Sequence, residues 1–448
     1  MKAQTPVLLL ALALMPGFGF AADRTVLHDV RLIDGKGGAP REHMDVAIEG
    51  ERIEAVGRHL AGGKVIDLSG KTVLPGLITD HSHLGLTQGT KASGENATEE
   101  NILRQLKQYL AYGVTTVMSL GLNQQSFYNL QPKIHSGSLP GADFFGADRG
   151  FGVPDGAPPA AGGILNSQVY RPRDATEARQ QVRETASRHP TLMKMWVDDF
   201  HGAMKQKISP EVQQAILNEA HKQGIRVAAH VFYLDDAKRL VGEGIDVLAH
   251  GVRDRPVDQA FIDALKKRGV WYIPTLGLDE TSYIFAEHPE LLSQPLLKHA
   301  LQAPLAAQLE DPVWRAKALQ DAKKLSEDHS AVDMNMANVK KLNDAGVKIG
   351  FGSDSGATAL RIAGFAEHHE LALLVKAGFT PLQAIETATR NAAALLKLDD
   401  RGTIAPGKRA DLLIVEGDPA SDIRAVDAIA EVWQRGKRVS GPLADFSP

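Results

Sequence analysis

Two histidines that could bind a metal, His81 and His83, follow directly on an apolar run that starts at Leu74. In a β-strand, residues i and i+2 point to the same face, so both imidazoles would be directed to one point where the strand ends. Imidazole nitrogen is a common ligand of zinc and other transition metals. A hydrogen-bonded pair in a loop would show the same spacing. A metal site therefore needs further ligands from other parts of the chain.

Further candidates lie in or at the ends of other apolar segments. They are Lys194 in segment 192–197, His230 and His250 at the ends of segments 225–230 and 245–250, and Asp354 at the end of segment 347–354. Taken singly, such a histidine can be a hydrogen-bonded core residue, and the aspartate can hold a turn. Lys194 differs, because a free ammonium inside an apolar strand is destabilising unless it is paired or neutralised. Six candidates on five strands favour a common metal site.

The elements that must bring these residues together are strands that alternate with helices. Eight apolar segments separated by helical patterns predict an α/β protein built on a parallel (β/α)8 TIM barrel. The segments are 74–83, 114–118, 142–146, 192–197, 225–230, 245–250, 270–274 and 347–354. In a TIM barrel the active site lies at the C-terminal ends of the strands, where the six candidates fall.

Outside the barrel, assigned to residues 74–399, the chain reads as short strands and turns. Segments 23–73 and 400–448 are predicted to form one small discontinuous β-sandwich domain from both chain ends. Two long segments interrupt the barrel pattern: a Gly/Pro-rich stretch at 150–163 and a mostly helical insertion at 280–343. Because long loops in compact domains are usually functional or disordered, both are expected to cover the pocket.

The first 22 residues have the pattern of a secretory signal peptide, with Lys2, an apolar stretch from Val7 to Met15 and a small-residue exit at Ala21-Ala22. We therefore expect a bacterial periplasmic or secreted protein without a membrane anchor after cleavage. The chain has no cysteine, which excludes disulfides, thiolate catalysis and Cys-ligated zinc. Its 50 basic and 54 acidic residues give a net charge of −4, so nothing indicates a nucleic-acid partner.

The pattern resembles the amidohydrolase superfamily, specifically its imidazolonepropionase-like and prolidase-like metal-dependent hydrolases. The resemblance covers nearly the whole chain after the predicted signal peptide. It is carried by Leu74-Pro75-Gly76-Leu77-Ile78 with His81 and His83, by Lys194, by Val227-Ala228-Ala229-His230, by Ala249-His250-Gly251, by Gly352-Ser353-Asp354 and by Gly402-Thr403-Ile404-Ala405-Pro406-Gly407-Lys408-Arg409-Ala410-Asp411-Leu412. Family members often have Asp-Thr where this chain has Thr79-Asp80, a swap that leaves the histidine pair in place.

The resemblance implies two divalent metal ions, with zinc favoured and manganese or cobalt as substitutes. One ion would take His81, His83 and Asp354. The other would take His230 and His250. Lys194 would carry a CO2-derived carbamate and bridge the two ions together with a hydroxide. A carbamate is an anion, which removes the objection to a buried lysine.

By the same resemblance, the bridging hydroxide attacks a carbonyl polarised by one metal. Asp354 would take the proton and pass it to the leaving amine. For the substrate we consider two residues near the strand ends: Tyr233 as a donor to the oxyanion and Arg253 as a partner for a carboxylate. A packed aromatic ring and a surface ion pair of Arg253 with Asp254 or Asp236 are the competing interpretations.

The leading hypothesis is a metal-dependent hydrolase of an amide bond in a dipeptide, an N-acyl amino acid or a cyclic amide. The same binuclear centre would also serve a lactone, ester or phosphotriester. A mononuclear deaminase or imidazolone hydrolase is a third possibility, although such enzymes do not need Lys194. A binding protein on an inactive hydrolase frame would be expected to lack ligands, and here the whole set is present. The resemblance also implies a homo-oligomer.

Overall fold

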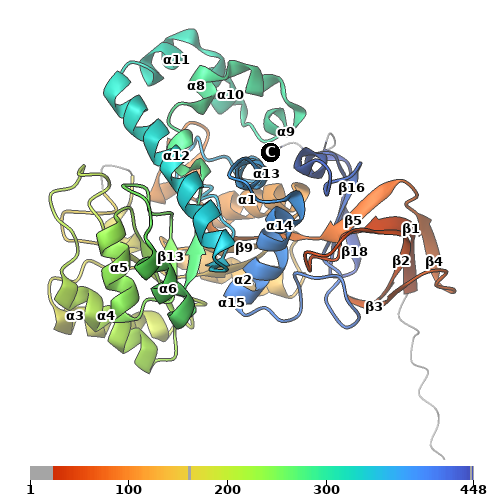
Figure 1. Ribbon diagram of the computed structural model, residues 1–448, viewed down its shortest axis with the longest axis horizontal. Coiled ribbons are helices and arrows are strands. Elements are labelled where there is room, and N and C mark those ends of the chain that lie inside the picture. The colour runs from red at the N-terminus through yellow and green to blue at the C-terminus, as the bar shows by residue number, and fades with distance from the viewer. Residues whose placement is uncertain (1–23, 160–162, 444–445, 447) are drawn as a thin grey trace, which may run out of the picture.

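The computed structural model describes residues 24–159, 163–443, 446 and 448. The predicted signal peptide lies outside the described residues. Figure 1 shows a barrel in the middle, a β layer on one side and a group of helices above the barrel. No helix in the described part of the chain combines the length and the hydropathy needed to cross a bilayer.

The β layer is built from both chain ends, as predicted. Its N-terminal strands are β1 (Arg24–Leu32), β2 (Arg41–Glu49), β3 (Arg52–Gly57), β4 (Lys64–Asp67) and β5 (Lys71–Pro75), and its C-terminal strands are β16 (Leu412–Glu416), β17 (Ile429–Gln434) and β18 (Lys437–Ser440). The strand order is β18-β17-β16-β5-β1-β2-β3, with β4 paired to β1. The antiparallel pairing of β5 with β16 joins the two ends of the chain, and Leu74 and Pro75 belong to this pairing. The sheet encloses an apolar core of its own.

The barrel consists of eight parallel strands. They are β6 (Leu77–Ser82), β9 (Val114–Ser119), β10 (Asp143–Gly146), β11 (Met193–Trp196), β12 (Val227–His230), β13 (Val247–Ala249), β14 (Trp271–Ile273) and β15 (Lys348–Ile349). They pair as β10-β9-β6 and as β11-β12-β13-β14-β15. Two isolated parallel bridges close the ring, Ser82 with Ser355 and Phe151 with Met195. The predicted TIM barrel is confirmed.

The second bridge gives the Gly/Pro-rich segment a role that differs from the expected cover. Phe151 is fully buried, its amide donates to the Lys194 carbonyl at 2.8 Å, and Trp196 donates back to the Phe151 carbonyl at 2.9 Å. The start of the segment therefore fills the gap between β10 and β11. A single residue pair carries no periodic pattern, so the sequence could not reveal this closure.

Helices follow the barrel strands around the outside (Figure 1). They are α1 (Glu99–Ala111), α2 (Gln125–His135), α3 (Ala175–Ala186), α4 (Pro210–Lys222), α5 (Leu234–Glu243), α6 (Gln259–Arg268), α13 (Phe365–Lys376), α14 (Pro381–Glu386) and α15 (Ala392–Leu396). Side chains cap two of these helices: Ser209 accepts from the Val212 amide at the start of α4, and Thr380 forms a capping box with Gln383 at the start of α14. A π-helical turn, Thr387–Asn391, separates α14 from α15.

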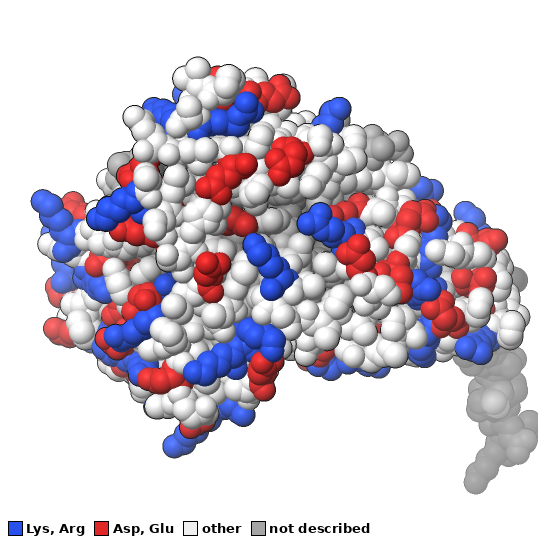
Figure 2. Space-filling model, turned by 45° about the horizontal axis from the view of Figure 1, so that its top comes forward, with Lys and Arg blue, Asp and Glu red and all other residues white. Residues whose placement is uncertain are grey.

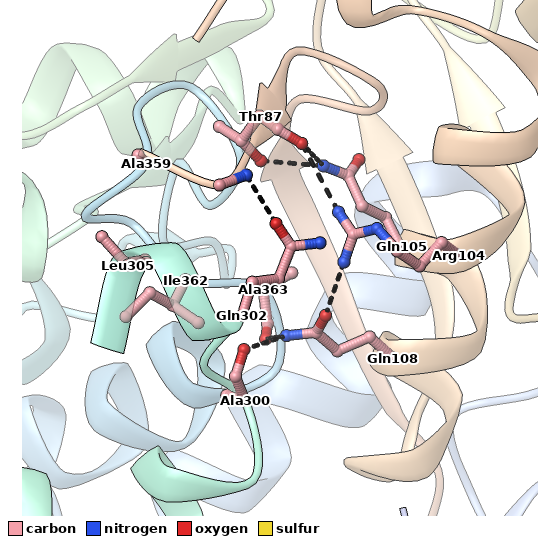
Figure 3. Close-up of a pocket in the computed structure, with 11 residues that line it drawn as sticks. Thr87, Arg104, Gln105, Gln108, Ala300, Gln302, Leu305, Ala359, Ile362 and Ala363 are labelled. Atoms are coloured by element: carbon pink, nitrogen blue, oxygen red, sulfur yellow. Dashed lines mark hydrogen bonds between the residues drawn. The ribbon is translucent and has the colours of Figure 1, made fainter. Parts of the chain in front are cut away.

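The insertion is helical, as predicted. Its helices are α7 (Gly277–Glu280), α8 (Ile284–Glu287), α9 (Pro295–Lys298), α10 (Ala303–Glu310), α11 (Pro312–Ala318) and α12 (Ala322–Asp344). The insertion interlocks with α1 around a cavity of about 30 Å³ that Figure 3 shows. There Gln108 donates to the carbonyls of Ala300 and Ala363 at 3.1 and 2.9 Å, and the Gly89 amide donates to Gln302. These partners make the cavity wall a structural contact between α1 and the insertion.

Candidate active site

Strand β6 and the segment after β15 bring three candidate ligands together. Nε2 of His81 and Nε2 of His83 each lie 3.1 Å from Oδ1 of Asp354. Backbone bonds fix this pairing, because the Asp354 amide donates to the His81 carbonyl at 3.0 Å and the His83 amide to the Ser355 carbonyl at 2.7 Å. Gly352 permits the close approach, since a Cβ there would lie 2.6 Å from the His81 Cβ.

The histidines of β12 and β13 lie beside this group. The rings of His81 and His250 are 4.5 Å apart between centroids, and those of His250 and His230 are 4.2 Å apart. Nδ1 of His250 lies 2.8 Å from the Thr275 hydroxyl, which leaves Nε2 for another partner. His250 has a φ of 75°, a conformation that non-glycine residues rarely adopt, so the turn after β13 is constrained.

Helix α12 of the insertion supports this turn directly. A Cβ at Gly251 would lie 1.7 Å from Oδ1 of Asn335, so only glycine fits under the helix. Asn335 donates to the Pro274 carbonyl at 2.9 Å, and Gly251 donates to the same carbonyl at 3.0 Å. The insertion thus holds the ends of β13 and β14 in place.

Lys194 is fully buried on β11, and its Nζ has no hydrogen-bond partner among the described residues. In the β11–β12 register it pairs with Ala228, two residues before His230. Burial lowers the pKa of Lys194 to about 7, although the carboxylates of Asp354 and Asp198 act in the opposite direction. A large fraction of the amine is therefore neutral at pH 7, and a neutral amine is the form that reacts with CO2.

The surroundings favour neutral histidines and a charged Asp354. Burial, followed by the charge of Lys194, lowers the pKa of His81 to about 3. The pKa values of His230 and His250 are lowered in the same direction, also chiefly by burial. Burial would raise the pKa of Asp354, but Arg361 and the histidines hold it well below its ordinary range. Neutral imidazoles and a carboxylate are the protonation states that bind metal ions.

These residues fit the divalent metal that the resemblance implies. Nδ1 of His81, Nδ1 of His83 and Nζ of Lys194 are buried polar atoms without hydrogen-bond partners in the described chain. Buried polar groups are normally satisfied, so several orphaned ones at one point indicate a missing polar partner. The donors are nitrogen and carboxylate oxygen, the ligands that zinc takes in catalytic sites.

A layer of buried residues positions Asp354 from behind. Ser353 and Ser355 donate to Oε1 of Glu367 at 2.5 and 2.6 Å, and the hydroxyl of Tyr109 lies 2.6 Å from that of Ser355. Glu370, whose pKa burial raises to about 8, accepts from the amides of Leu276 and Gly277 at the start of α7.

The two predicted substrate residues have protein partners. The Tyr233 hydroxyl donates to Asp199 at 3.0 Å, and the Lys207 ammonium lies 3.9 Å from its ring centroid. Arg253 is buried, and its Nε lies 2.9 Å from Oδ2 of Asp279 on α7. The expected surface pair of Arg253 with Asp254 or Asp236 is therefore wrong, because α7 folds back over the barrel and supplies the partner.

Sequence reasoning missed two charged residues at the site. Asp198 follows β11, its Oδ2 lies 3.4 Å from Nε2 of His230, and burial raises its pKa to about 7. Arg361 lies in the loop after β15 and donates to Oδ2 of Asp354. The Asp198-Asp199 pair at a strand end was an available signal for the first residue. Nothing local marks the second.

Comparison with known proteins agrees with the TIM-barrel fold. The model of the amidohydrolase family matches residues 72–439. The chain belongs to the amidohydrolase family. The amidohydrolase fold matches solved structures of a Xaa-Pro dipeptidase with bound methionine in the active site (23% identity, 93% of this chain and 99% of the other, TM-score 0.73) and of A. niger ochratoxinase (21% identity, 94% and 96%, TM-score 0.73).

Two curated relatives differ in how much of this amidohydrolase they cover. An imidazolonepropionase of Deinococcus deserti is 36% identical, but over 22% of this chain and only 26% of its own length. A 5-methylthioadenosine/S-adenosylhomocysteine deaminase of Thermoanaerobacter pseudethanolicus is 22% identical over 88% of this chain and 85% of its own length. The predicted enzyme class, a metal-dependent hydrolase acting on carbon–nitrogen bonds, is the one that family membership gives.

Proposed function

We propose that this amidohydrolase cleaves the amide bond of a small N-acyl amino acid or dipeptide. The observation that carries the proposal is Lys194, which is fully buried among four histidines and Asp354 and has no hydrogen-bond partner in the described part of the chain. His81, His83 and Asp354 would hold one divalent ion, most simply zinc, and His230 and His250 a second, with Lys194 as a carbamate between them. When bound, the ions supply Lewis-acid polarisation of a carbonyl and hydroxide at neutral pH.

The protein's own residues would then perform the remaining steps. The pKa of Asp354 is held below its ordinary range, so its carboxylate is charged at neutral pH. It would accept the proton released beside it during the attack and pass that proton to the leaving nitrogen. Glu367, through Ser353 and Ser355, keeps the Asp354 segment in place. Because the ligands are buried, bulk water does not screen their charges, and each electrostatic contact among them is stronger than it would be in solution.

The proposal is supported from outside the chain by the names of the similar structures, which include a Xaa-Pro dipeptidase and a molinate hydrolase. The test is a screen of dipeptides and N-acyl amino acids, with release of the free amino acid as the readout, on protein whose metal content has been measured. Close to two divalent ions per chain and amino-acid release are the expected results. Active protein that holds a single ion would contradict the binuclear assignment.

A deaminase is the second candidate, because a deaminase matches most of the chain. It predicts ammonia release from an amino-heterocycle and activity that survives loss of Lys194. The ammonia assay and the amino-acid assay on one preparation separate the two candidates.

We further propose export to the periplasm, on the basis of the N-terminal sequence pattern. Membership of the amidohydrolase family supports a small-molecule substrate as the partner. N-terminal sequencing of protein from the periplasmic fraction should start near Ala22 or Asp23, and an intact Met1 there would contradict this. Homo-oligomerisation, expected from family resemblance, is tested by light scattering of the same material.

A further inference from the structure

A guanidinium that the predicted ligand set does not include lies directly against Asp354. Arg361 donates through Nη1 to Oδ2 of Asp354 and through Nη2 to the Leu278 carbonyl of α7 at 3.3 Å. Its Nε is buried and has no hydrogen-bond partner within the described chain. The side chain is 17% exposed, against 6% for that of Asp354, so Arg361 lies on the outer side of the carboxylate.

The backbone fixes this arginine relative to the candidate ligands. The Gly356 amide donates to the Arg361 carbonyl at 2.8 Å, and the Arg361 amide donates to the Thr358 carbonyl at 3.1 Å. Gly356 has a φ of +79°, and a Cβ there would lie 2.1 Å from the carbonyl oxygen of His83. The loop 354–361 is therefore packed tightly onto the end of β6.

We propose that Arg361 binds the carboxylate of the leaving amino acid and thereby restricts the enzyme to substrates with a free carboxylate next to the scissile amide. The inference rests on the proposed function, in which Asp354 hands a proton to the leaving nitrogen. In an N-acyl amino acid, that nitrogen and the carboxylate carbon are bonded to the same α-carbon. The groups that serve them must therefore be neighbours, as Asp354 and Arg361 are.

The chemistry of the pair agrees with this role. A guanidinium binds a carboxylate with parallel N–H donors, and an arginine beside a dry site needs an anion to remain stable. Asp354 is the anion that Arg361 contacts now, and a metal ion would draw on the same carboxylate. The substrate carboxylate would then supply Arg361 with a second anionic partner.

Arg253, the other arginine near the strand ends, provides the contrast. Its Nε faces Asp279, its Nη1 donates to the Gly251 carbonyl at 2.9 Å, and its guanidinium lies 5.0 Å from the Phe232 ring centroid. Its Nε and Nη2 have no hydrogen-bond partner among the described residues, but Asp279, the carboxylate that pairs with Arg253, is not one of the six candidate ligands, whereas Asp354 is. Arg253 serves as the matched control.

The test compares N-acetyl-L-leucine, N-acetyl-L-proline and N-acetyl-L-phenylalanine with their carboxamides on metal-loaded enzyme. The wild type should favour the acids by at least about 100-fold in kcat/KM, because a site built to pair a polar group rejects analogues that lack it. Arg361→Gln should bring this ratio close to one, because any change at Asp354 slows acids and carboxamides alike, whereas only the acids also lose the contact with the guanidinium. Arg361→Lys should retain an intermediate ratio. Equal use of acids and amides by the wild type would overturn the proposal.

A binding measurement separates failure of this inference from failure of the proposed function. Calorimetry with free L-leucine, L-proline and L-phenylalanine, and with their amides, needs no turnover. Arg361→Gln should weaken amino-acid binding at least about tenfold and leave the amides unchanged. Metal content and the unfolding midpoint are measured for each variant; if Arg361→Gln does not fold, Arg361→Lys gives the same comparison. Loss of acid preference in Arg253→Gln with full preference in Arg361→Gln would assign the carboxylate to Arg253 instead.

Discussion

Two groups of buried charges lie at opposite ends of the barrel, and they differ in how completely they are paired. At the start of β10, Asp143 accepts hydrogen bonds from Arg401, Arg409 and Arg435. At the strands' other end, the group around Asp354 contains Lys194 and two histidines with nitrogens that lack partners in the described chain. Complete charge pairing at one end and orphaned donors at the other agree with the division between the stabilising and catalytic faces of a TIM barrel.

The paired group joins the β layer to the barrel. Arg409 bonds Asp411 beside β16 as well as Asp143, Arg435 lies in the β17–β18 turn, and Arg401 also donates to Thr116 of β9 at 3.1 Å. The surface, by contrast, carries acidic and basic side chains interspersed over the face that Figure 2 shows. Exposed pairs of that kind contribute little to stability, whereas removing one partner from a buried group leaves uncompensated buried charges and is costly.

Among the predictions that test the difference between the two groups, the largest effect is expected at Lys194. Lys194→Ala should lower activity by about 10²- to 10³-fold, the loss typical of a preorganised charged group in an active site. As a carbamate it would separate two cations, which otherwise repel each other in a dry pocket. Metal content should fall toward one ion per chain, and added acetate or propionate should restore part of both quantities. A packing lysine would instead leave a cavity, with unchanged metal content and no rescue.

The opposite result is expected at the paired group. Asp143→Ala should lower the free energy of unfolding by about 3–5 kcal/mol, because it leaves three buried guanidinium groups without their shared anion. Metal content and the activity of the protein that remains folded should not change. Urea denaturation and metal analysis measure the two quantities, and Lys323→Ala, in an exposed pair with Glu327, is the control with little expected effect. Metal loss in Asp143→Ala would show that the two ends are not independent.

The pH dependence of metal-free protein should also separate the two groups. His81 has its pKa lowered to about 3 by burial and Lys194, whereas the unfolded chain takes up that proton near pH 6.5. Its stabilising contribution is therefore complete above pH 6.5 and is lost as the pH falls toward 3. For Asp143, burial raises the pKa, but the charges of Arg409, Arg401 and Arg435 outweigh this effect, and the pKa lies below its ordinary value of 3.8. The contribution of Asp143 to the free energy of unfolding is therefore lost only at lower pH.

Between pH 7.5 and 5.5, His81 alone should remove about 1–2 kcal/mol from the free energy of unfolding of the chelator-treated protein. His230 and His250 act in the same direction. Denaturation curves at both pH values check this, with His81→Asn and Asp143→Asn as a pair. The first variant should reduce the pH effect and the second should leave it intact. An equal reduction in both would contradict the assignment of this titration to the catalytic end.

The sequence predicts those parts of this arrangement that depend on local patterns. Strand periodicity places His81, His83, His230 and His250 at strand ends, and parallel strands bring those ends together. Local sequence patterns do not predict residues whose positions depend on tertiary packing. Arg253 is buried because α7, which carries Asp279, folds back over the barrel. Arg361 faces Asp354 because Gly356 turns the loop against His83, and neither contact leaves a periodic signal.

Tyr233 gives the smallest expected effect and refines the boundary of the catalytic group. Its hydroxyl is bonded to Asp199 and its ring to Lys207, so we expect Tyr233→Phe to change kcat/KM by less than about threefold. A hydroxyl that stabilised an oxyanion would show a loss of about 10²- to 10³-fold in kcat instead. Steady-state kinetics on the best substrate of the screen distinguishes the two outcomes. Asp199→Asn is the matched variant, since it keeps the hydrogen bond but removes the charge: if Asp199 merely holds the tyrosine, both substitutions should have similarly small effects. A large loss in Tyr233→Phe with none in Asp199→Asn would mean that the hydroxyl leaves Asp199 and turns toward the substrate during the reaction.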